Sequence, residues 1–397
     1  MTTKDLWESK EVCCGCELCA SSCPKSVIEM TPDEEGFLYP RVVKEQDCIG
    51  CSKCIKVCPM KSPGRQTNDI VKGYSGYAND EEEIKTSASG SFATQLYAVF
   101  IDSFQGVVYG VRYNNSFEQA VYCRADKKTE LSAFKGSKYI QARKGFIYQQ
   151  VLADLKSGRR VLFIGLPCEI SALYHAVGKN TDFLYTVSLI CHGPTTEYIQ
   201  KEYVTKLQKK YKSSITTFSV RYKTTGWKPY YIYAAFKNGR HFLRQFDFSD
   251  FGLAFQYMKR PSCSSCQYKY GNKQFGILAD LTIGDYHAVE ERTSHYHKWG
   301  VSQACTHTDK GEELMKLLES SCTLYGVSNE IMAKTNRAFY SAIPIKKERE
   351  QFVEKLINKG LHRACTQYGI YVPYMYGRLK KRIKIRIVKF RDSIIRR

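Results

Sequence analysis

The sequence predicts an α/β protein (α+β overall) with a small cysteine-rich domain at its N-terminal end. Cysteines recur at a fixed spacing between residues 13 and 58, and strand-like apolar runs alternate with helix-like runs between residues 106 and 211. Successive strand–helix units pack into a mainly parallel sheet. A chain of 397 residues is also too long for one compact core, so more than one domain is expected.

The composition is that of a globular protein that works in a reducing compartment. Hydrophobic residues make up 43% and aromatic residues 13% of the chain, which argues against disorder. The opening residues "MTTKDLWESK" lack the apolar segment of a signal peptide, and no apolar run approaches the roughly 18 residues of a membrane-spanning helix. The seventeen cysteines are therefore expected to be metal ligands in the cytoplasm rather than disulfides.

Two cysteine runs, "CCGCELCASSCP" and "CIGCSKCIKVCP", share the spacing Cys-x2-Cys-x2-Cys-x3-Cys-Pro. This is the run of bacterial two-cluster ferredoxins, in which three cysteines hold one [4Fe–4S] cluster and the fourth ligates the other. The run predicts the ligands of two clusters, which are Cys13, Cys16, Cys19 and Cys58 for the first and Cys48, Cys51, Cys54 and Cys23 for the second. Structural zinc is the alternative, and two complete copies of the run argue against it. Cys14 is surplus to the pattern and is expected to have no ligand role.

The later elements begin after an acidic, polar segment at residues 79–90. β-Branched and aromatic residues favour strands, and helical periodicity followed by a glycine favours helices. In chain order these patterns predict strands at 106–113 and 120–126, a helix at 145–158, a strand at 159–165, a helix at 166–178, a strand at 182–190 and a helix at 194–211. Pro194 is expected near the first turn of the last helix.

Four further cysteines fall where ligands collect in α/β folds. Cys168 and Cys191 each follow a predicted strand, so both belong to the carboxyl edge of the sheet. Cys263 and Cys266 form a Cys-x2-Cys pair, called here the clip, which supplies only two of the four ligands of a tetrahedral site. The four residues could hold a third cluster, because helix starts at this edge favour an anionic group. The alternative is two buried cysteines and a zinc site completed by His192 or another donor, and spacing alone leaves the choice even.

Seven stretches, in this order, resemble the beta subunit of coenzyme F-420 (deazaflavin) hydrogenase/dehydrogenase joined to a two-cluster ferredoxin domain. They are "TSASGSF" (86–92), "FKGSKYIQA" (134–142), "GRRVLFIGLPCEISAL" (158–173), "CHGPT" (191–195), "TGWKPYY" (225–231), "KRPSCSSCQYK" (259–269) and "ADLTIGDYH" (279–287). Together with the cysteine runs, the resemblance covers about residues 5–290. Seven motifs in one order make it specific.

The resemblance implies a flavin, usually FAD, beside a [4Fe–4S] cluster in the α/β domain, and it favours a cluster over zinc for the four cysteines. Candidate flavin-binding residues are Ser87, Ser89, Gly90, Gly136, Ser137, Lys138 and Tyr139. The first three can cap a helix and offer N–H groups to a phosphate, and Lys138 can supply a counter-charge. A plain helix cap and an ordinary turn are the alternatives. Ser91 replaces a usual glycine, Leu166 a common threonine and His287 a usual tryptophan, so the substrate side is expected to differ.

The resemblance further implies an iron–sulfur flavoprotein oxidoreductase that passes electrons between ferredoxin-type clusters and FAD and reduces or oxidises a small organic substrate, such as a deazaflavin. Because the flavin carries the chemistry, no acid–base pair is required and no catalytic residue is assigned. An electron-transfer subunit that feeds a partner enzyme is the alternative. The expected organisation is a ferredoxin-type domain (1–75), a linker (76–90), N-terminal (91–175) and C-terminal (176–372) parts of the family domain, and a basic tail (373–397).

The formal charge of +21 suggests anionic partners. We expect ferredoxin or another acidic electron carrier as the donor. A nucleic-acid-binding iron–sulfur protein is a remote alternative, and no nucleic acid partner is expected because no binding motif accompanies the charge. In the tail, one helical stripe predicts peripheral contact with the anionic inner face of the cell membrane; it consists of Leu379, Ile383, Ile387, Phe390 and Ile394. A helix docked on the protein's own surface, or a strand, is the alternative.

Overall fold

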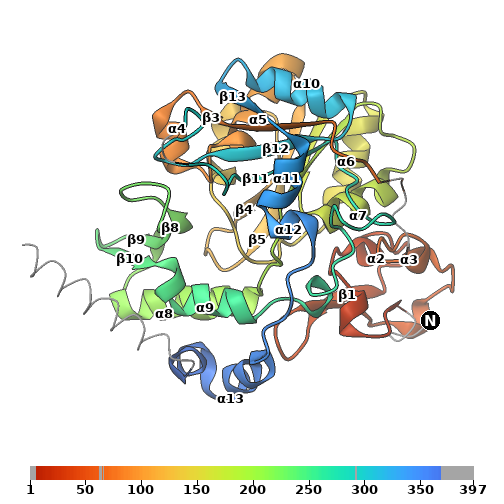
Figure 1. Cartoon of the computed structure of the whole chain (residues 1–397). Coiled ribbons are helices and arrows are strands. Elements are labelled where there is room, and N and C mark those ends of the chain that lie inside the picture. Colours follow the sequence, from red (N-terminus) through yellow and green to blue (C-terminus); the bar gives the residue numbers. More distant parts are fainter. Residues whose placement is uncertain (1–5, 62–64, 66, 291–292, 368–397) are drawn as a thin grey trace, which may run out of the picture.

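The computed structural model describes residues 6–61, 65, 67–290 and 293–367 (Figure 1). Its centre is an eight-stranded sheet in the order β13-β3-β12-β11-β7-β6-β4-β5. The strands are β3 (Lys72–Ala78), β4 (Val107–Tyr113), β5 (Ala120–Ala125), β6 (Val161–Gly165), β7 (Leu184–Leu189), β11 (Leu281–Asp285), β12 (Ser302–Thr306) and β13 (Cys322–Val327). Strands β11, β7, β6 and β4 pair in parallel, and antiparallel strands extend the sheet at both edges. The predicted α/β class with a parallel sheet at its centre is confirmed.

Both faces of this sheet are buried, because successive side chains of its central strands enter two different cores. On β6, Val161 and Phe163 belong to one core, and Leu162 and Ile164 belong to the other. Helices α6 (Ile147–Lys156) and α7 (Pro167–Val177) cover the first face, whereas α5 (Phe92–Phe104) and α10 (Asp309–Leu318) cover the second (Figure 1). Each fully buried side chain of this kind contributes about 1.5–3 kcal/mol. The two cores therefore fix the carboxyl ends of the central strands, where the candidate ligands lie.

A smaller layer stands beside the main sheet. Strands β8 (Ile215–Tyr222), β9 (Tyr231–Phe236) and β10 (His241–Gln245) form an antiparallel sheet in the order β10-β9-β8. Helices α8 (Glu197–Tyr211) and α9 (Asp250–Tyr257) pack on each other next to it, and α13 (Arg349–Gln367) packs on both helices (Figure 1). Apolar residues of β8 and β9 share the core of α6 and α7, so this layer is joined to the main sheet.

The cysteine-rich N-terminal segment is a hairpin of β1 (Ile28–Pro32) and β2 (Leu38–Val42) with two one-turn helices, α2 (Leu18–Ser21) and α3 (Lys53–Lys56). Helix α2 contacts α6, which places the segment against the α/β domain (Figure 1). The other short elements are α4 (Glu81–Thr86), α11 (Asn329–Thr335), α12 (Arg337–Tyr340), η1 (Lys10–Val12), η2 (Glu45–Asp47), η3 (Lys128–Phe134), η4 (Phe246–Phe248) and η5 (Pro261–Cys263).

The strands and helices predicted between residues 106 and 211 are all present, and none of their ends differs by more than three residues. Helix α8 begins at Glu197, because the Thr196 side chain accepts a hydrogen bond from the Ile199 N–H, so Pro194 lies before the helix and not in its first turn. The expected linker 76–90 is not a plain connection, since it holds the end of β3 and all of α4. The basic tail 373–397 lies outside the described residues, and its stripe stays a prediction. Within the described ranges, no helix is long and apolar enough to cross a membrane.

Candidate iron–sulfur and cofactor site

The two N-terminal cysteine runs adopt the same backbone turn. Gly15 and Glu17 in the first run have φ angles of 66° and 65°, and Gly50 and Ser52 in the second run have φ angles of 65° and 54°. Left-handed residues beside right-handed ones direct backbone N–H groups to one side, which makes a concave surface suited to an anion. Each loop therefore offers its cysteines a common, anion-binding centre.

The structure brings both predicted N-terminal ligand sets together. One small pocket is lined by Cys23, Cys48, Cys51 and Cys54. The fourth cysteine of the first run thus lies with three of the second, as the ferredoxin spacing predicts. In the other set, burial and the neighbouring thiols of Cys13 and Cys58 raise the pKa of Cys19 well above its usual range. Cys16 is buried close to Cys19 and Cys14.

A second small pocket, called here the four-cysteine pocket, is lined by Cys168, Cys191, Cys263 and Cys266. Cys168 lies in the first turn of α7, after β6, and Cys191 follows β7, so neighbouring parallel strands deliver both to one edge. Gly193 permits the close approach of the clip: its N–H donates to Cys191 Sγ at 3.2 Å, and a Cβ there would lie 3.3 Å from Cys263 Sγ. Within the described part of the chain, no three His, Cys, Asp or Glu side chains are grouped to hold a single metal ion.

Cys14 also lines the four-cysteine pocket, although the sequence pattern suggested no role for it. Hydrogen bonds with the Cys16 and Cys168 thiols hold the pKa of Cys14 well below its usual range, despite its burial. Cys14 therefore bridges the first N-terminal cysteine set and the four-cysteine pocket. The surplus cysteine beside Cys13 was the only sequence signal for this contact.

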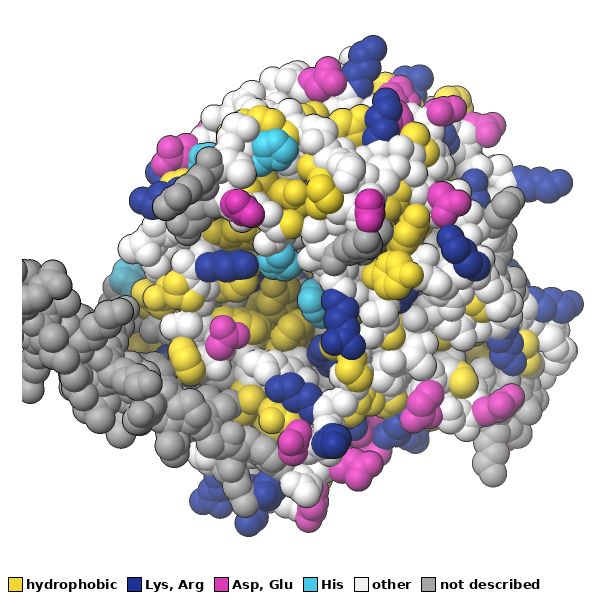
Figure 2. Space-filling model, viewed as in Figure 1, with side chains coloured by type: hydrophobic (Ala, Val, Ile, Leu, Met, Phe, Trp, Pro, Cys, Tyr) yellow, Lys and Arg dark blue, Asp and Glu magenta, His cyan; other side chains and the backbone are white. Residues whose placement is uncertain are grey.

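A larger cavity of about 820 Å³ opens at the same edge of the sheet. Figure 2 shows a hollow with an apolar floor and a rim of charged and histidine side chains. The predicted flavin-binding residues that line the cavity are Ser89, Gly136, Ser137, Lys138 and Tyr139. Ser87 and Gly90 are not among its lining residues. The Ser87 hydroxyl hydrogen-bonds with Thr94 Oγ1 at 3.1 Å, and the Gly90 N–H donates to Ser302 Oγ at 2.9 Å, so both residues shape the loop before α5.

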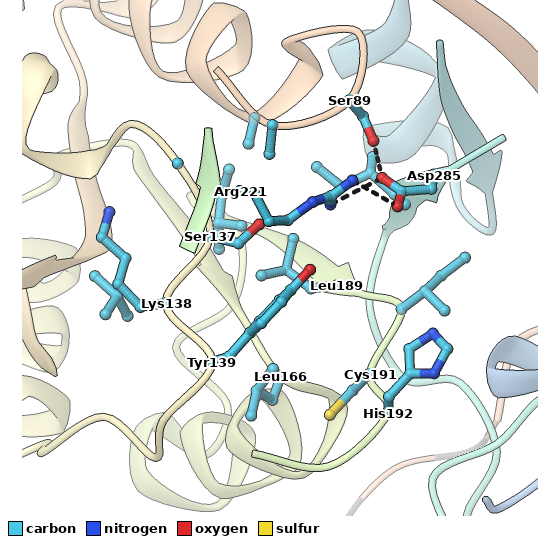
Figure 3. Close-up of a pocket in the computed structure, with 18 of the residues that line it drawn as sticks. Ser89, Ser137, Lys138, Tyr139, Leu166, Leu189, Cys191, His192, Arg221 and Asp285 are labelled. Atoms are coloured by element: carbon cyan, nitrogen blue, oxygen red, sulfur yellow. Dashed lines mark hydrogen bonds and ion pairs between the residues drawn. The ribbon is translucent and has the colours of Figure 1, made fainter. Parts of the chain in front are cut away.

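Lys138 does not supply the free counter-charge that the sequence suggested. Its ammonium group donates to the carbonyl oxygens of Ala133, Phe134 and Lys135, at 3.3, 2.9 and 2.9 Å, and so closes the end of η3. In Figure 3 the Lys138 side chain points away from Arg221 and Asp285. Burial lowers the pKa of Lys138 to about 7. A lysine with these partners positions the loop and leaves the role of cation in the cavity to another residue.

Arg221 is a buried cation that lines the cavity, and the sequence did not single it out. It comes from β8 and pairs with Asp285 at the end of β11 through two contacts of 3.1 and 2.9 Å (Figure 3). The Ser89 hydroxyl donates to the same carboxylate, and the Tyr230 hydroxyl donates to it at 3.3 Å. Burial opposes the charge on Asp285, but Arg221 still holds the pKa of that carboxyl below its usual range. The pair joins residues 64 positions apart, and only the motif "ADLTIGDYH" marked one of its members.

The cavity and the four-cysteine pocket share one wall, made of residues that line both spaces. These residues are Leu166, Glu169, Cys191, His192, Gly193 and Pro194. Figure 3 shows Cys191 and His192 on one loop close to Tyr139 and Leu166. Burial, together with Lys259 and Lys269, lowers the pKa of His192 to about 4, so this residue is neutral at neutral pH. A group held by Cys191 would therefore lie directly beside a ligand in the cavity.

The three positions that depart from the resembling family, Ser91, Leu166 and His287, all line the cavity. Ser91 has a φ of 76°, a left-handed conformation that glycine adopts without steric cost. This conformation accounts for the glycine that the family usually carries there. The His287 ring stacks on Trp227 with centroids 6.0 Å apart, and His287 Nδ1 lies 3.3 Å from Lys228 Nζ.

Comparison with known proteins gives two family matches and two curated relatives. Residues 158–325 match the family described as the C terminus of the coenzyme F420 hydrogenase/dehydrogenase beta subunit, and residues 12–62 match the 4Fe-4S dicluster domain. The chain is 24% identical over 194 residues to one subunit of the F(420)H(2) dehydrogenase of Methanosarcina mazei, which covers 46% of this chain and 53% of that protein. It is 37% identical over 68 residues to an uncharacterized polyferredoxin-like protein of Methanocaldococcus jannaschii, which covers 15% of this chain and 40% of that protein. The chain thus spans about half or less of these curated relatives.

Among solved structures, a chain of the F420-reducing [NiFe] hydrogenase complex from Methanosarcina barkeri is similar, with a TM-score of 0.46 and 15% identity. The similarity covers 76% of this chain and 92% of that chain. The two family matches confirm the resemblance that the motifs indicated. Residues 12–62 therefore form a 4Fe-4S dicluster domain, and residues 158–325 belong to the C-terminal family of the coenzyme F420 hydrogenase/dehydrogenase beta subunit.

Proposed function

We propose that this protein is an iron–sulfur flavoprotein oxidoreductase that holds three [4Fe–4S] clusters and one FAD. It exchanges electrons between an acidic carrier, such as ferredoxin, and a small organic substrate. The observation that carries the proposal is the wall shared by the four-cysteine pocket and the 820 Å³ cavity, in which Cys191 borders both spaces. Centres on the two sides of such a wall are close enough to exchange electrons directly.

The four-cysteine pocket fits an anionic cluster. Four thiolates and their cluster bring negative charge into a buried space, and a buried charge is tolerated only with compensation. Arg260 and Lys269 line this pocket and are 1% and 5% exposed. The Lys269 ammonium donates to the Cys191 carbonyl at 2.7 Å, which keeps its charge beside the loop. Zinc remains the competing occupant, and the metal content decides between the two.

The cavity fits a large polar cofactor. Its volume lies within the roughly 300–1,000 Å³ typical of small-molecule sites. Within the described chain, Arg221 Nε and Ser91 Oγ are buried without a hydrogen-bond partner, and both residues line the cavity. A buried donor without a partner costs about 1–3 kcal/mol, so a ligand with acceptor atoms would relieve this cost. Because Ser91 lies directly before the first turn of α5, that helix end also favours an anionic group such as a phosphate.

The chain's own residues hold and orient the cofactor. Asp285 fixes the Arg221 guanidinium through two contacts, and the Tyr230 ring lies 4.1 Å from its Cζ. The buried Lys223 ammonium donates to the Ser89 carbonyl at 2.7 Å and holds the loop before α5 in place. When bound, a flavin accepts single electrons from clusters and exchanges a pair with an organic substrate. Positioning and charge are therefore the tasks left to the protein.

An electron-transfer subunit without a substrate of its own is the second candidate. It is favoured by one observation: the curated relative that matches 46% of this chain is named as a subunit of a dehydrogenase. In that case the clusters and the flavin would feed a partner enzyme. Copurification with a second protein, and no turnover of small substrates by the isolated chain, would favour this candidate.

The decisive experiment is anaerobic purification followed by iron and flavin determination. We expect roughly twelve irons and one FAD per chain, because twelve cysteines are assigned to three four-iron clusters. About eight irons with one zinc would refute the third cluster, and a chain without flavin would refute the use of the cavity.

A Cys263→Ala variant sharpens this test. It should lose about four irons and keep the spectrum of the N-terminal clusters, since Cys263 lines the four-cysteine pocket and not the pocket of the second N-terminal set. Cys305→Ala is the matched control, because Cys305 is a buried cysteine of β12 whose pKa is raised by burial alone. It should retain all its iron. Equal iron in the two variants would contradict the ligand assignment.

A further inference from the structure

Arg260 is a buried arginine that joins the first N-terminal cysteine set to the four-cysteine pocket. It is 1% exposed and lines the pocket. Its Nε donates to the Cys13 carbonyl at 2.6 Å, and its Nη2 lies 3.5 Å from Cys13 Sγ. Nη1 donates to Gln141 Oε1 at 2.9 Å, and Nη2 donates to the Leu38 carbonyl at 2.7 Å. The guanidinium is thus fixed next to a predicted cluster ligand.

Among the described residues, no carboxylate balances the charge of Arg260. None of the ion pairs in this part of the chain involves it. The Tyr39 ring lies 4.1 Å from its Cζ, and its other partners are neutral or are cysteines. Burial opposes the charge, and the thiols of Cys13 and Cys14 together with Tyr39 raise its pKa. A buried cation of this kind is expected where an anionic centre provides the compensation.

The second N-terminal cysteine set has different surroundings. Of the described residues that line its pocket, the only cationic side chain is Lys25, which is exposed to solvent. Cys51, one of the four cysteines there, is exposed as well. Solvent screens an exposed charge strongly, whereas a buried charge acts through a lower effective dielectric constant. The two N-terminal sites, similar in backbone and ligands, therefore differ in solvent exposure and in the cation next to their ligands.

We propose that Arg260 raises the reduction potential of the cluster held by Cys13 above that of the cluster held by Cys51, and so draws electrons from the exposed site toward the four-cysteine pocket. This inference rests on the proposed function, because it assumes clusters on the two N-terminal sets. One-electron reduction adds one negative charge to a cluster and breaks no bond. A fixed positive charge stabilises the reduced form more than the oxidised form, and hydrogen bonds to the sulfur ligands act in the same direction.

The test is a redox titration of the anaerobically purified full chain with dithionite as reductant, followed by electron paramagnetic resonance. A Cys51→Ser background identifies the second cluster, since an oxygen ligand changes the spectrum of that cluster alone. In the wild type, the first cluster should be reduced at the higher potential. In Arg260→Gln, the ratio of reduced to oxidised first cluster at a fixed potential should fall about tenfold, equivalent to about 59 mV for one electron. The second cluster should change little.

Arg260→Lys separates charge from packing. Lysine keeps the positive charge but lacks the planar set of N–H donors of a guanidinium. The ratio of reduced to oxidised first cluster should therefore fall less than in Arg260→Gln. An equal fall in both variants would assign the effect to packing and overturn the proposal. If the glutamine variant loses its iron, the reduction potentials of the wild type still test the proposal. A first cluster with a potential at or below that of the second cluster overturns it. A protein with only eight irons refutes the third cluster alone, since this comparison needs only the N-terminal sites.

Discussion

Ser91 is held in a backbone conformation that costs energy for any residue with a side chain. Its φ is 76°, and its hydroxyl is buried without a hydrogen-bond partner in the described chain. A left-handed conformation costs an L-residue about 1–2 kcal/mol, and glycine avoids this cost. Glycine also has more conformational freedom in the unfolded chain, which offsets part of the gain in stability. We expect Ser91→Gly to raise the free energy of unfolding by about 0.5–1 kcal/mol, measured as a higher Tm of the cofactor-free protein.

Ser91→Ala is the matched control for this residue. It removes the same hydroxyl but keeps the Cβ that makes the left-handed conformation costly. No comparable gain is expected. If alanine stabilised the protein as much as glycine, the unpartnered hydroxyl would be the source of the cost, and the backbone explanation would be wrong.

The sequence predicted which segments meet at the site but not which side chains carry its charge. The motif around Lys138 was predicted at the cavity, and the structure has it there. The Lys138 ammonium, however, donates to three carbonyls at the end of η3, and the buried cation found in the cavity is Arg221. A local motif predicts the position of its loop. The partner of a charge depends on strands that are distant in sequence, such as β8 and β11.

Strand β3 supports the loop that opens the cavity. The Ala78 N–H donates to the Gly90 carbonyl at 2.9 Å, and a Cβ on Gly90 would lie 2.4 Å from the Gly76 carbonyl oxygen and 2.7 Å from the Ser302 nitrogen. Both neighbours are backbone atoms of the sheet, which cannot move aside easily. We expect Gly90→Ala to lower the free energy of unfolding by about 1–3 kcal/mol through overpacking. Thermal unfolding, together with flavin content after reconstitution, measures this effect.

Gly326 in β13 provides the control within the same sheet. A Cβ there would meet nothing within 4 Å. Gly326→Ala should therefore leave both the Tm and the flavin content close to those of the wild type. Destabilisation by both substitutions to the same degree would mean that the sheet is sensitive to any added methyl group, and that the contact of Gly90 with β3 is not special.

The parallel strands at the centre of the sheet could be predicted because their sequence signals are local. Strands β6 and β7 are short apolar runs followed by helices, which is the common pattern of strand–helix units in α/β proteins. Strand β3 gave no such signal. Its sequence "KGYSGYA" contains two glycines, and it pairs with β12 and β13, which lie more than 220 residues further along the chain. Only the packed tertiary structure makes this segment a strand.

For the molecule as a whole, net charge connects the proposed electron route to its donor. The chain carries +21, of which +9 lies between Arg378 and Arg397. Exposed lysines also lie close in sequence to the second cysteine set, at Lys25, Lys44 and Lys53, and Lys25 lines its pocket. Small ferredoxins are commonly acidic, so a basic protein attracts them over distances limited by the Debye length, about 10 Å at 0.1 M salt. The proposed route therefore predicts electrostatic steering at the step where the carrier docks.

We expect reduction of the bound flavin by reduced ferredoxin to slow several-fold as salt rises from low to physiological concentration, because screening shortens the range of that attraction. Stopped-flow absorbance under anaerobic conditions measures the rate. A chain ending at Tyr376 is the matched variant, since it removes the +9 of the tail and leaves the lysines around Cys51 in place. It should keep most of the salt dependence if the carrier docks near Cys51. If the reduction rate is independent of salt in both chains, the positive charge is not used to attract the carrier. If the salt dependence disappears when the tail is removed, the carrier docks at the tail.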